Sequence, residues 1–266
     1  MVSVSEGNPP QSLLSALTGE PLGDIGRLIH FPLTADPSGF HHLLLAECAL
    51  RQIDGVRQVV FILSNGQHPD PMKRRKILEG EIRLSLLQQS LEGFTDPAVS
   101  YPARMALQTG SPLTLKQEAW EISTVEFRWE RPVRLAEHVQ RLRKKLDPSA
   151  EVYGNEQPNP SLEHQQRIAM LVGTDLLHRM LDAKIFTDKD LQTISEGCLL
   201  LAVPRDERVL SDILVELQSE RGVNLPVGVL DPGLLPEKLR VLLNLSSTII
   251  RRAVQAGQSL LGFMPQ

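Results

Sequence analysis

Apolar runs of strand length alternate with helical patterns from residue 27 onward. The runs are rich in Val, Ile, Leu and Phe, as in strands buried on both faces of a parallel sheet, and they span 27–36, 58–65, 167–175 and 198–207. Hydrophobic residues at helical spacing predict helices over 42–53, 74–93 and 134–146, the last of them charged and solvated. This alternation predicts an α/β fold, a doubly wound, mostly parallel Rossmann-like sheet of five or six strands.

Other parts of the chain give weaker signals. Residues 97–110 show no clear period, whereas 119–127 predicts a further strand with Ile122 and Val125 facing inward. Residues 1–26 are mixed and turn-rich. We therefore expect an N-terminal extension over 1–26, followed by a single α/β domain over 27–266.

Composition narrows the class of protein. The 266 residues are 41% hydrophobic, enough for a large core, and the net charge of −4 argues against a nucleic-acid binder. No apolar run is long enough to cross a bilayer, and the N-terminus lacks a signal-peptide pattern. Cys48 and Cys198 lie far apart in apolar surroundings, which indicates core thiols in a reducing compartment. A cytoplasmic protein without nucleic-acid or membrane partners is expected.

Candidate chemistry follows the apolar runs. In an open parallel sheet, ligands bind at the carboxyl ends of the strands, where the strand order reverses. The segments "TADPSGFHH", "SNGQHPDP", "GTDLLHR" and "PRDER" occupy those ends. In the first of them, His41 and His42 stand at a helix start, where free backbone N–H groups already favour an anion.

These segments, in their order, resemble the nucleotidyltransferase superfamily marked by a His-x-Gly-His motif, and most closely the nicotinate- or nicotinamide-mononucleotide adenylyltransferases. "LTADPSGFHHL" lies over the first motif, with Asp36-Pro37 and His42 matching. Lys73 closes the second loop, Arg83 leads the next helix, and "GTD" and "PRDE" end two later strands. The most specific match is "LSSTIIRRAVQAGQSLLGFMP" at 245–265, which departs from the family pattern Ile-Ser-Ser-Thr-x-Ile-Arg only at Leu245.

The resemblance implies adenylyl transfer from ATP to a pyridine mononucleotide in NAD biosynthesis, with Mg²⁺ accompanying ATP and no metal-ligating residue assigned. It places His42 and Arg251 in catalysis. For ATP and phosphate binding it implies Asp36, His41, Lys73, Gly173, Asp175, Arg205, Ser246, Ser247 and Thr248. A homo-oligomer is compatible with it. Ordinary alternatives remain for three of these positions: a solvated helix start at Lys73, a turn at Gly173 and a surface ion pair at Arg205.

Departures from the family pattern leave alternatives open. Leu33 stands for a glycine, Gly39 for the first motif histidine and His41 for the motif glycine. The family's Ser-Tyr-Thr-x-Asp-Thr segment is not visible near 119–140. His41 either substitutes for the missing histidine or obstructs the backbone approach that glycine permits. The sequence is thus compatible with a pyridine-mononucleotide adenylyltransferase, a nucleotidyltransferase for another phosphate substrate, or a non-catalytic nucleotide-binding relative.

Overall fold

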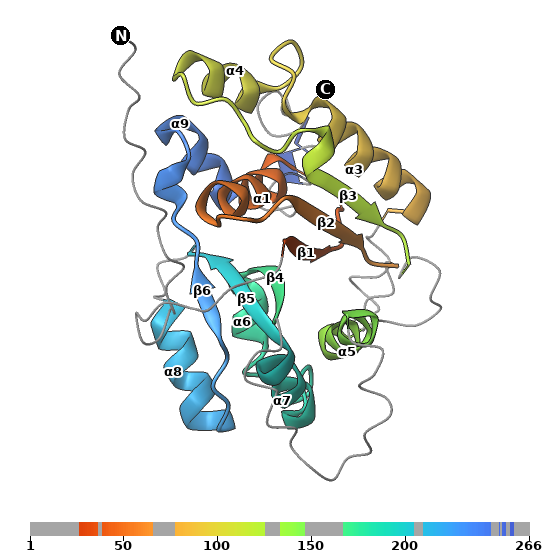
Figure 1. Ribbon diagram of the computed structural model, residues 1–266, viewed down its shortest axis with the longest axis vertical. Coiled ribbons are helices and arrows are strands. Elements are labelled where there is room, and N and C mark those ends of the chain that lie inside the picture. Colours follow the sequence, from red (N-terminus) through yellow and green to blue (C-terminus); the bar gives the residue numbers. More distant parts are fainter. Residues whose placement is uncertain are drawn as a thin grey trace.

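The computed structural model describes residues 27–36, 39–65, 78–125, 134–146, 167–204, 210–245, 250, 252–253 and 256–257. Within these ranges the chain forms a six-stranded sheet in the order β3-β2-β1-β4-β5-β6 (Figure 1). All five strand pairings are parallel. The strands are β1 Leu28–Leu33, β2 Gln58–Leu63, β3 Trp120–Ser123, β4 Ile168–Gly173, β5 Cys198–Val203 and β6 Val227–Val229. The predicted fold class is confirmed.

Helices cover both faces of this sheet (Figure 1). One face packs against α1 Phe40–Gln52, α3 Gly80–Phe94, α4 Tyr101–Gln108 and α9 Glu237–Arg240, together with short 3₁₀ turns that include η5 Pro232–Leu234 and η6 Val241–Asn244. The other face packs against α5 Leu135–Leu146, α6 Thr174–Arg179, α7 Asp188–Gly197 and α8 Leu210–Arg221. A further 3₁₀ turn, η1 Gln117–Ala119, leads into β3.

The central strands are buried on both faces, as their unbroken apolar sequences predict. In β5, all six residues are buried. Leu199 and Leu201 belong to the core on the α1 side, and Leu200 and Ala202 to the core on the α7 side. The alternation of side chains along a strand therefore distributes one apolar run between two cores.

Two local predictions were wrong, and one segment for which the sequence predicted no element forms a helix. Residues 97–110, without a clear period, contain α4, whose first turn is capped by the Ser100 hydroxyl accepting the backbone N–H of Ala103 at 3.2 Å. Val125 does not face inward: β3 ends at Ser123, and Val125 is 44% exposed. Helix α5 is not merely solvated, because Ala136, His138 and Val139 are buried.

Helix α5 changes the environment of a histidine on β1. Burial, together with the nearby positive charges of His138, Lys145 and Arg141, lowers the pKa of His30 to about 4. The Nδ1 atom of His30 is buried without a hydrogen-bond partner in the described part of the chain. His30 is therefore neutral at physiological pH, as the burial of an imidazole beside cations requires.

Helix α1 is fastened by polar groups at its carboxyl-terminal half. The fully buried Glu47 carboxylate accepts the backbone N–H groups of Thr114 and Leu115 at 2.8–2.9 Å and pairs with Arg51 at 2.6 Å. Arg51 also donates to the carbonyls of Ser111, Pro112 and Leu234. Both charges are thus compensated inside the fold, as buried charges must be.

Gln52 adds a second attachment at the same end of α1. Its amide donates to the carbonyl of Val229 at 3.0 Å and accepts the backbone N–H of Asp231 at 2.6 Å. Helix α1 is thereby hydrogen-bonded to two segments distant in sequence, 111–115 and 229–234.

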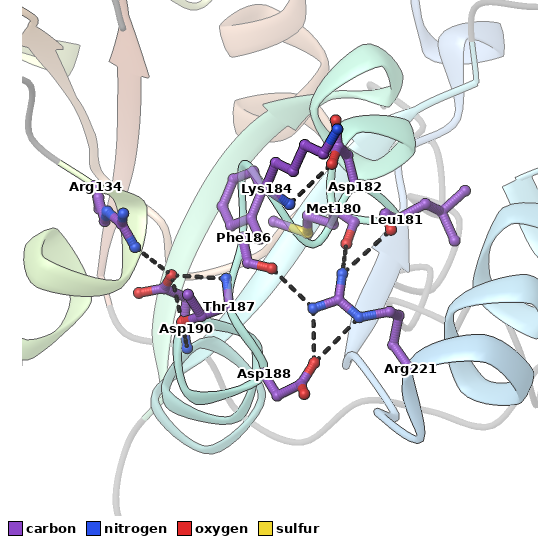
Figure 2. A network of polar contacts seen from close by, with 10 residues as sticks. All are labelled: Arg134, Met180, Leu181, Asp182, Lys184, Phe186, Thr187, Asp188, Asp190 and Arg221. Atoms are coloured by element: carbon purple, nitrogen blue, oxygen red, sulfur yellow. Dashed lines mark hydrogen bonds and ion pairs between the residues drawn. The ribbon is translucent and has the colours of Figure 1, made fainter.

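A second polar network fastens the opposite face of the sheet (Figure 2). Arg221, at the end of α8, donates to the carbonyls of Met180, Leu181 and Phe186 at 2.8–3.2 Å and pairs with Asp188 at 2.7 Å. Only 8% of the Arg221 side chain is exposed. One guanidinium therefore holds the α6–α7 connection against α8.

The start of α7 carries a separate capping arrangement (Figure 2). The Thr187 hydroxyl accepts the N–H of Asp190 at 3.2 Å, while the Asp190 carboxylate accepts the N–H of Thr187 at 2.9 Å. Burial opposes ionisation of Asp190, but these hydrogen bonds and the Arg134 charge outweigh it and lower the pKa of the carboxyl.

Both cysteines are buried free thiols, as predicted. Burial raises the pKa of each to about 12. Neither Cys48 nor Cys198 therefore offers a reactive thiolate near neutral pH.

Across the described ranges, every helix is too short or too polar to span a lipid bilayer.

Replacing Arg221 with Met should lower the free energy of unfolding by ~2–4 kcal/mol, because three carbonyls lose a charged donor in a mostly buried site. The matched control is Arg134→Met, which removes the Asp190 ion pair of an arginine that is 53% exposed and should cost under ~1 kcal/mol. Urea unfolding followed by circular dichroism measures both. Equal losses would contradict a structural role specific to Arg221.

Candidate functional site

The strand order reverses direction between β1 and β4, which are neighbours in the sheet. The chain leaves β1 towards the face covered by α1, and it leaves β4 towards the face covered by α6 and α7. In open α/β sheets, ligands bind at the carboxyl ends of the strands beside such a switch point. The groups found there are the turn 34–36, the start of α1 and the start of α6.

The first turn of α1 carries two histidines and no acidic residue. His41 is buried at 2% exposure, whereas His42 is partly exposed. The backbone N–H of Gly39 donates to Nδ1 of His42 at 3.4 Å. Because the first turn itself carries no carboxylate at the positive end of the helix dipole, it is electrostatically suited to an anion.

The imidazole of His42 lies against two other rings. Its centroid is 3.8 Å from that of His41, with the planes inclined by 40°, and 6.1 Å from that of Phe31 on β1. Phe31 is itself buried in the core. The partly exposed imidazole is thus oriented by buried neighbours from the strand and the helix.

Gly39 is in contact with Ile250, a residue near the other end of the chain. A β-carbon added to Gly39 in ideal geometry would lie 2.6 Å from Cδ1 of Ile250 and 2.9 Å from Nδ1 of His41. Ile250 is fully buried and belongs to the "LSSTIIRRAV" segment. One residue of the C-terminal motif, Ile250, therefore packs against the start of α1.

Asp36 follows β1 and is buried at 3% exposure. One oxygen of its carboxylate accepts the backbone N–H of Leu78 at 3.1 Å, just before α3 begins. The preceding residue, Ala35, has a φ of 51°, a left-handed conformation that is uncommon outside glycine. The Asp36 side chain thus joins the β1 turn to α3, and its predicted role in ATP binding stays a prediction.

Arg83 connects the segments that follow β1 and β2 by hydrogen bonds. Its guanidinium donates to the carbonyls of Thr34 at 2.7 Å, Ser64 at 3.0 Å and Leu78 at 3.0 Å, and the side chain is almost fully buried. Burial lowers the pKa of this guanidinium, and the charge of Asp36 acts in the opposite direction. Because an arginine stays protonated at any physiological pH, Arg83 is a fixed cation beneath the site.

The end of β4 differs from the predicted Gly-Thr-Asp turn, because α6 begins at Thr174 directly after the strand. The Asp175 carboxylate lies close against Gly173 and pairs with Arg179 at 3.5 Å. The Asp175 side chain is 74% exposed. Gly173 and Asp175 therefore stand at the switch point, and their contact with ATP remains a prediction.

The remaining predicted residues lie outside the described ranges. These are Lys73, Arg205, Ser246, Ser247, Thr248 and Arg251. Of the predicted site, the described ranges bring Asp36, His41 and His42 together around the β1–α1 connection. Within those ranges, no group of three His, Cys, Asp or Glu side chains is placed to hold a metal ion.

Sequence reasoning assigned no site role to two residues that shape this region. The sequence identifies Arg83 only as the first arginine of a predicted helix. Its carbonyl partners belong to segments distant in sequence, so local pattern does not reveal them. Ile250 was visible only as part of the C-terminal motif, and its packing against Gly39 has no local signal.

The fold is similar to that of solved structures of nicotinic acid mononucleotide adenylyltransferase from Plasmodium falciparum. The structure complexed with APC matches with a TM-score of 0.52 and 8% sequence identity, over 88% of this chain and 86% of that chain. The structure complexed with NaAD matches with a TM-score of 0.51 and 9% identity, over 89% and 87%. At such identity, the likeness establishes a shared fold. No protein-family model and no curated protein matches the sequence.

Replacing Arg83 with Met should lower the free energy of unfolding by ~3–5 kcal/mol, because buried carbonyls and Asp36 lose their cationic partner. Amide hydrogen exchange at Ser64, whose N–H donates to Leu33 O, should also accelerate. The control is Arg104→Met, since Arg104 binds two carbonyls on the exposed surface and should cost under ~1 kcal/mol. A Ser64 exchange rate unchanged in Arg83→Met would contradict the structural role.

Proposed function

We propose that this chain transfers the adenylyl group of ATP to nicotinate or nicotinamide mononucleotide and releases pyrophosphate. The observation that carries the proposal is the packing of Ile250 against Gly39. This contact places Ile250, one residue of the "SSTIIR" motif, at the histidine-bearing start of α1 beside the switch point of the sheet. The shared fold with nicotinic acid mononucleotide adenylyltransferase structures supports the same activity.

The reaction needs alignment and charge neutralisation. A phosphate oxygen of the mononucleotide attacks the α-phosphorus of ATP, and the bond from that phosphorus to the bridging oxygen breaks as pyrophosphate leaves. No covalent intermediate with the protein forms. The protein therefore holds two polyanions in line and stabilises the charge that develops on the phosphate oxygens.

His42 is the described residue best suited to that charge. Its Nδ1 accepts the Gly39 N–H, so the proton of a neutral imidazole resides on Nε2. In the proposal, this N–H and backbone N–H groups of the first α1 turn bind the α-phosphate. His42 then contributes more in the transition state, when negative charge builds, than in the ground state.

The C-terminal segment is proposed to hold the β- and γ-phosphates. Ser246 or Ser247 would cap the final helix, with Thr248 beside them, and Arg251 would bridge phosphate oxygens through its planar guanidinium. Lys73 and Arg205 are proposed as further phosphate ligands, and Gly173 and Asp175 as contacts on the adenosine side. Mg²⁺ is proposed to arrive as the ATP complex, where it screens phosphate oxygens while retaining most of its waters.

One observation favours a second candidate, a nucleotide-binding relative without turnover. Gly39 leaves no room for a side chain, and His41 is buried, so the α1 turn presents a single partly exposed imidazole. ATP binding without pyrophosphate release from any mononucleotide would identify this alternative. Turnover with a mononucleotide that lacks a pyridine ring, in preference to one that has it, would identify another nucleotidyltransferase activity.

When a panel of mononucleotides is tested with ATP and Mg²⁺, pyrophosphate release should occur with a pyridine mononucleotide. It should stop when EDTA removes the metal.

His42→Ala should lower kcat by ~10²–10³ with little change in the Kd for ATP, because the lost donor acts on developing charge. The control is His178→Ala, an exposed histidine on α6. Equal rates for His42→Ala and the natural protein would remove His42 from the reaction.

Arg251→Ala should weaken ATP binding by ~1.5–3 kcal/mol, the scale of lost charged hydrogen bonds. The neighbouring Arg252 is exposed and provides the matched control, because Arg252→Ala removes the same charge one position away. Isothermal titration calorimetry measures both affinities. If the two variants lose the same affinity, the effect of Arg251 is one of general charge and not of a specific contact.

A further inference from the structure

The backbone of Gly39 does not itself require a glycine. Its φ of −123° and ψ of 171° are extended values that any residue adopts. The requirement is spatial, because an added β-carbon would lie 2.6 Å from Cδ1 of Ile250, 2.9 Å from Nδ1 of His41 and 3.1 Å from Cε1 of His41. Real β-carbons essentially never approach another atom within 3.0 Å.

The space beside Gly39 is therefore filled by the imidazole of His41. That ring lies against the His42 ring, with centroids 3.8 Å apart and planes inclined by 40°. On the same side chain, Nδ1 of His42 faces the Gly39 N–H at 3.4 Å, and Phe31 supplies the third ring at 6.1 Å. His41, Gly39 and Phe31 thus surround His42 from the helix start, its cap and the adjacent strand.

We propose that His41 is a positioning residue: its buried ring, lodged in the space that Gly39 leaves vacant, holds the His42 imidazole in one orientation and one tautomer. The Gly39 N–H keeps Nδ1 as an acceptor, so the proton stays on Nε2, the end of the ring away from the cap. This orientation is needed if His42 donates to a phosphate oxygen, and to that extent the inference rests on the proposed function.

Gly39 is more than a position at which the first motif histidine has been lost. A side chain introduced at Gly39 would have to displace His41 or Ile250, so glycine at 39 and histidine at 41 form one unit. Ile250→Val removes the Cδ1 atom that meets the added β-carbon. Gly39→Ala should therefore disturb His42, and adding Ile250→Val should recover part of the natural state.

The test is nitrogen-15 NMR of the His42 ring in the full-length protein without ligand, because the Nδ1 and Nε2 shifts report the tautomer directly. His42 should be the Nε2–H form in the natural protein. His41→Phe keeps a ring of similar size and should leave the His42 shifts nearly unchanged, whereas His41→Ala should shift them towards a mixture of tautomers. His138→Ala is the control for stability, since His138 is as buried as His41 but lies on α5.

Steady-state kinetics distinguish a positioning role of His41 from a contribution to folding alone. His41→Ala should lower kcat at least tenfold with the Kd for ATP within about twofold, and His41→Phe should retain most of the rate. His42 shifts that are identical in the natural protein and His41→Ala, or that move equally in His138→Ala, would overturn the inference. If the shifts move as expected and no variant or natural protein releases pyrophosphate, the positioning stands and the proposed function fails.

Discussion

Burial of α1 on nearly every side is the constraint on which the rest of the structure depends. Ten of its thirteen residues are buried, between the sheet on one side and α3, η5 and η6 on the others. A helix enclosed in this way must be largely apolar around its circumference, as "LLLAECAL" is apart from Glu47. Its polar groups then need partners inside the fold. Glu47, Arg51 and Gln52 find them at one end, and the two histidines stand at the other.

The buried helix places its first turn at the switch point of the sheet, and Arg83 holds the loops around that turn. A cation bound to three backbone carbonyls holds the turns after β1 and β2 at a set distance from α3. Asp36 completes the arrangement by accepting the Leu78 N–H. The backbone segments around the candidate site are thus held in place by buried charged side chains, a common way of preorganising a site.

Much of this architecture was predictable from local pattern. The strands β1, β2, β4 and β5 follow from unbroken apolar runs, and α1 from its hydrophobic positions, because both signals act over a few neighbouring residues. Helix α4 has only eight residues and depends on its Ser100 cap and on tertiary packing, so periodicity did not reveal it. The site needed longer-range information: Arg83 binds carbonyls 19 and 49 residues away, and Gly39 meets Ile250 near the other end of the chain. No rule of spacing predicts such pairs.

The polar attachments of α1 also bear on the order in which the chain acquires its structure. Arg51 reaches a carbonyl 183 residues away, and Gln52 reaches one 177 residues away. During synthesis, the helix start that carries His41 and His42 therefore emerges long before the segments that hold its other end. Until residues 111–115 emerge, Glu47 and Arg51 lack most of their partners, and until residues 229–231 emerge, Gln52 lacks the backbone groups that its amide binds. Docking α1 into an apolar core before then is unfavourable. The candidate site consequently matures late and as part of one cooperative unit, and contacts this distant in sequence are typical of slow folding.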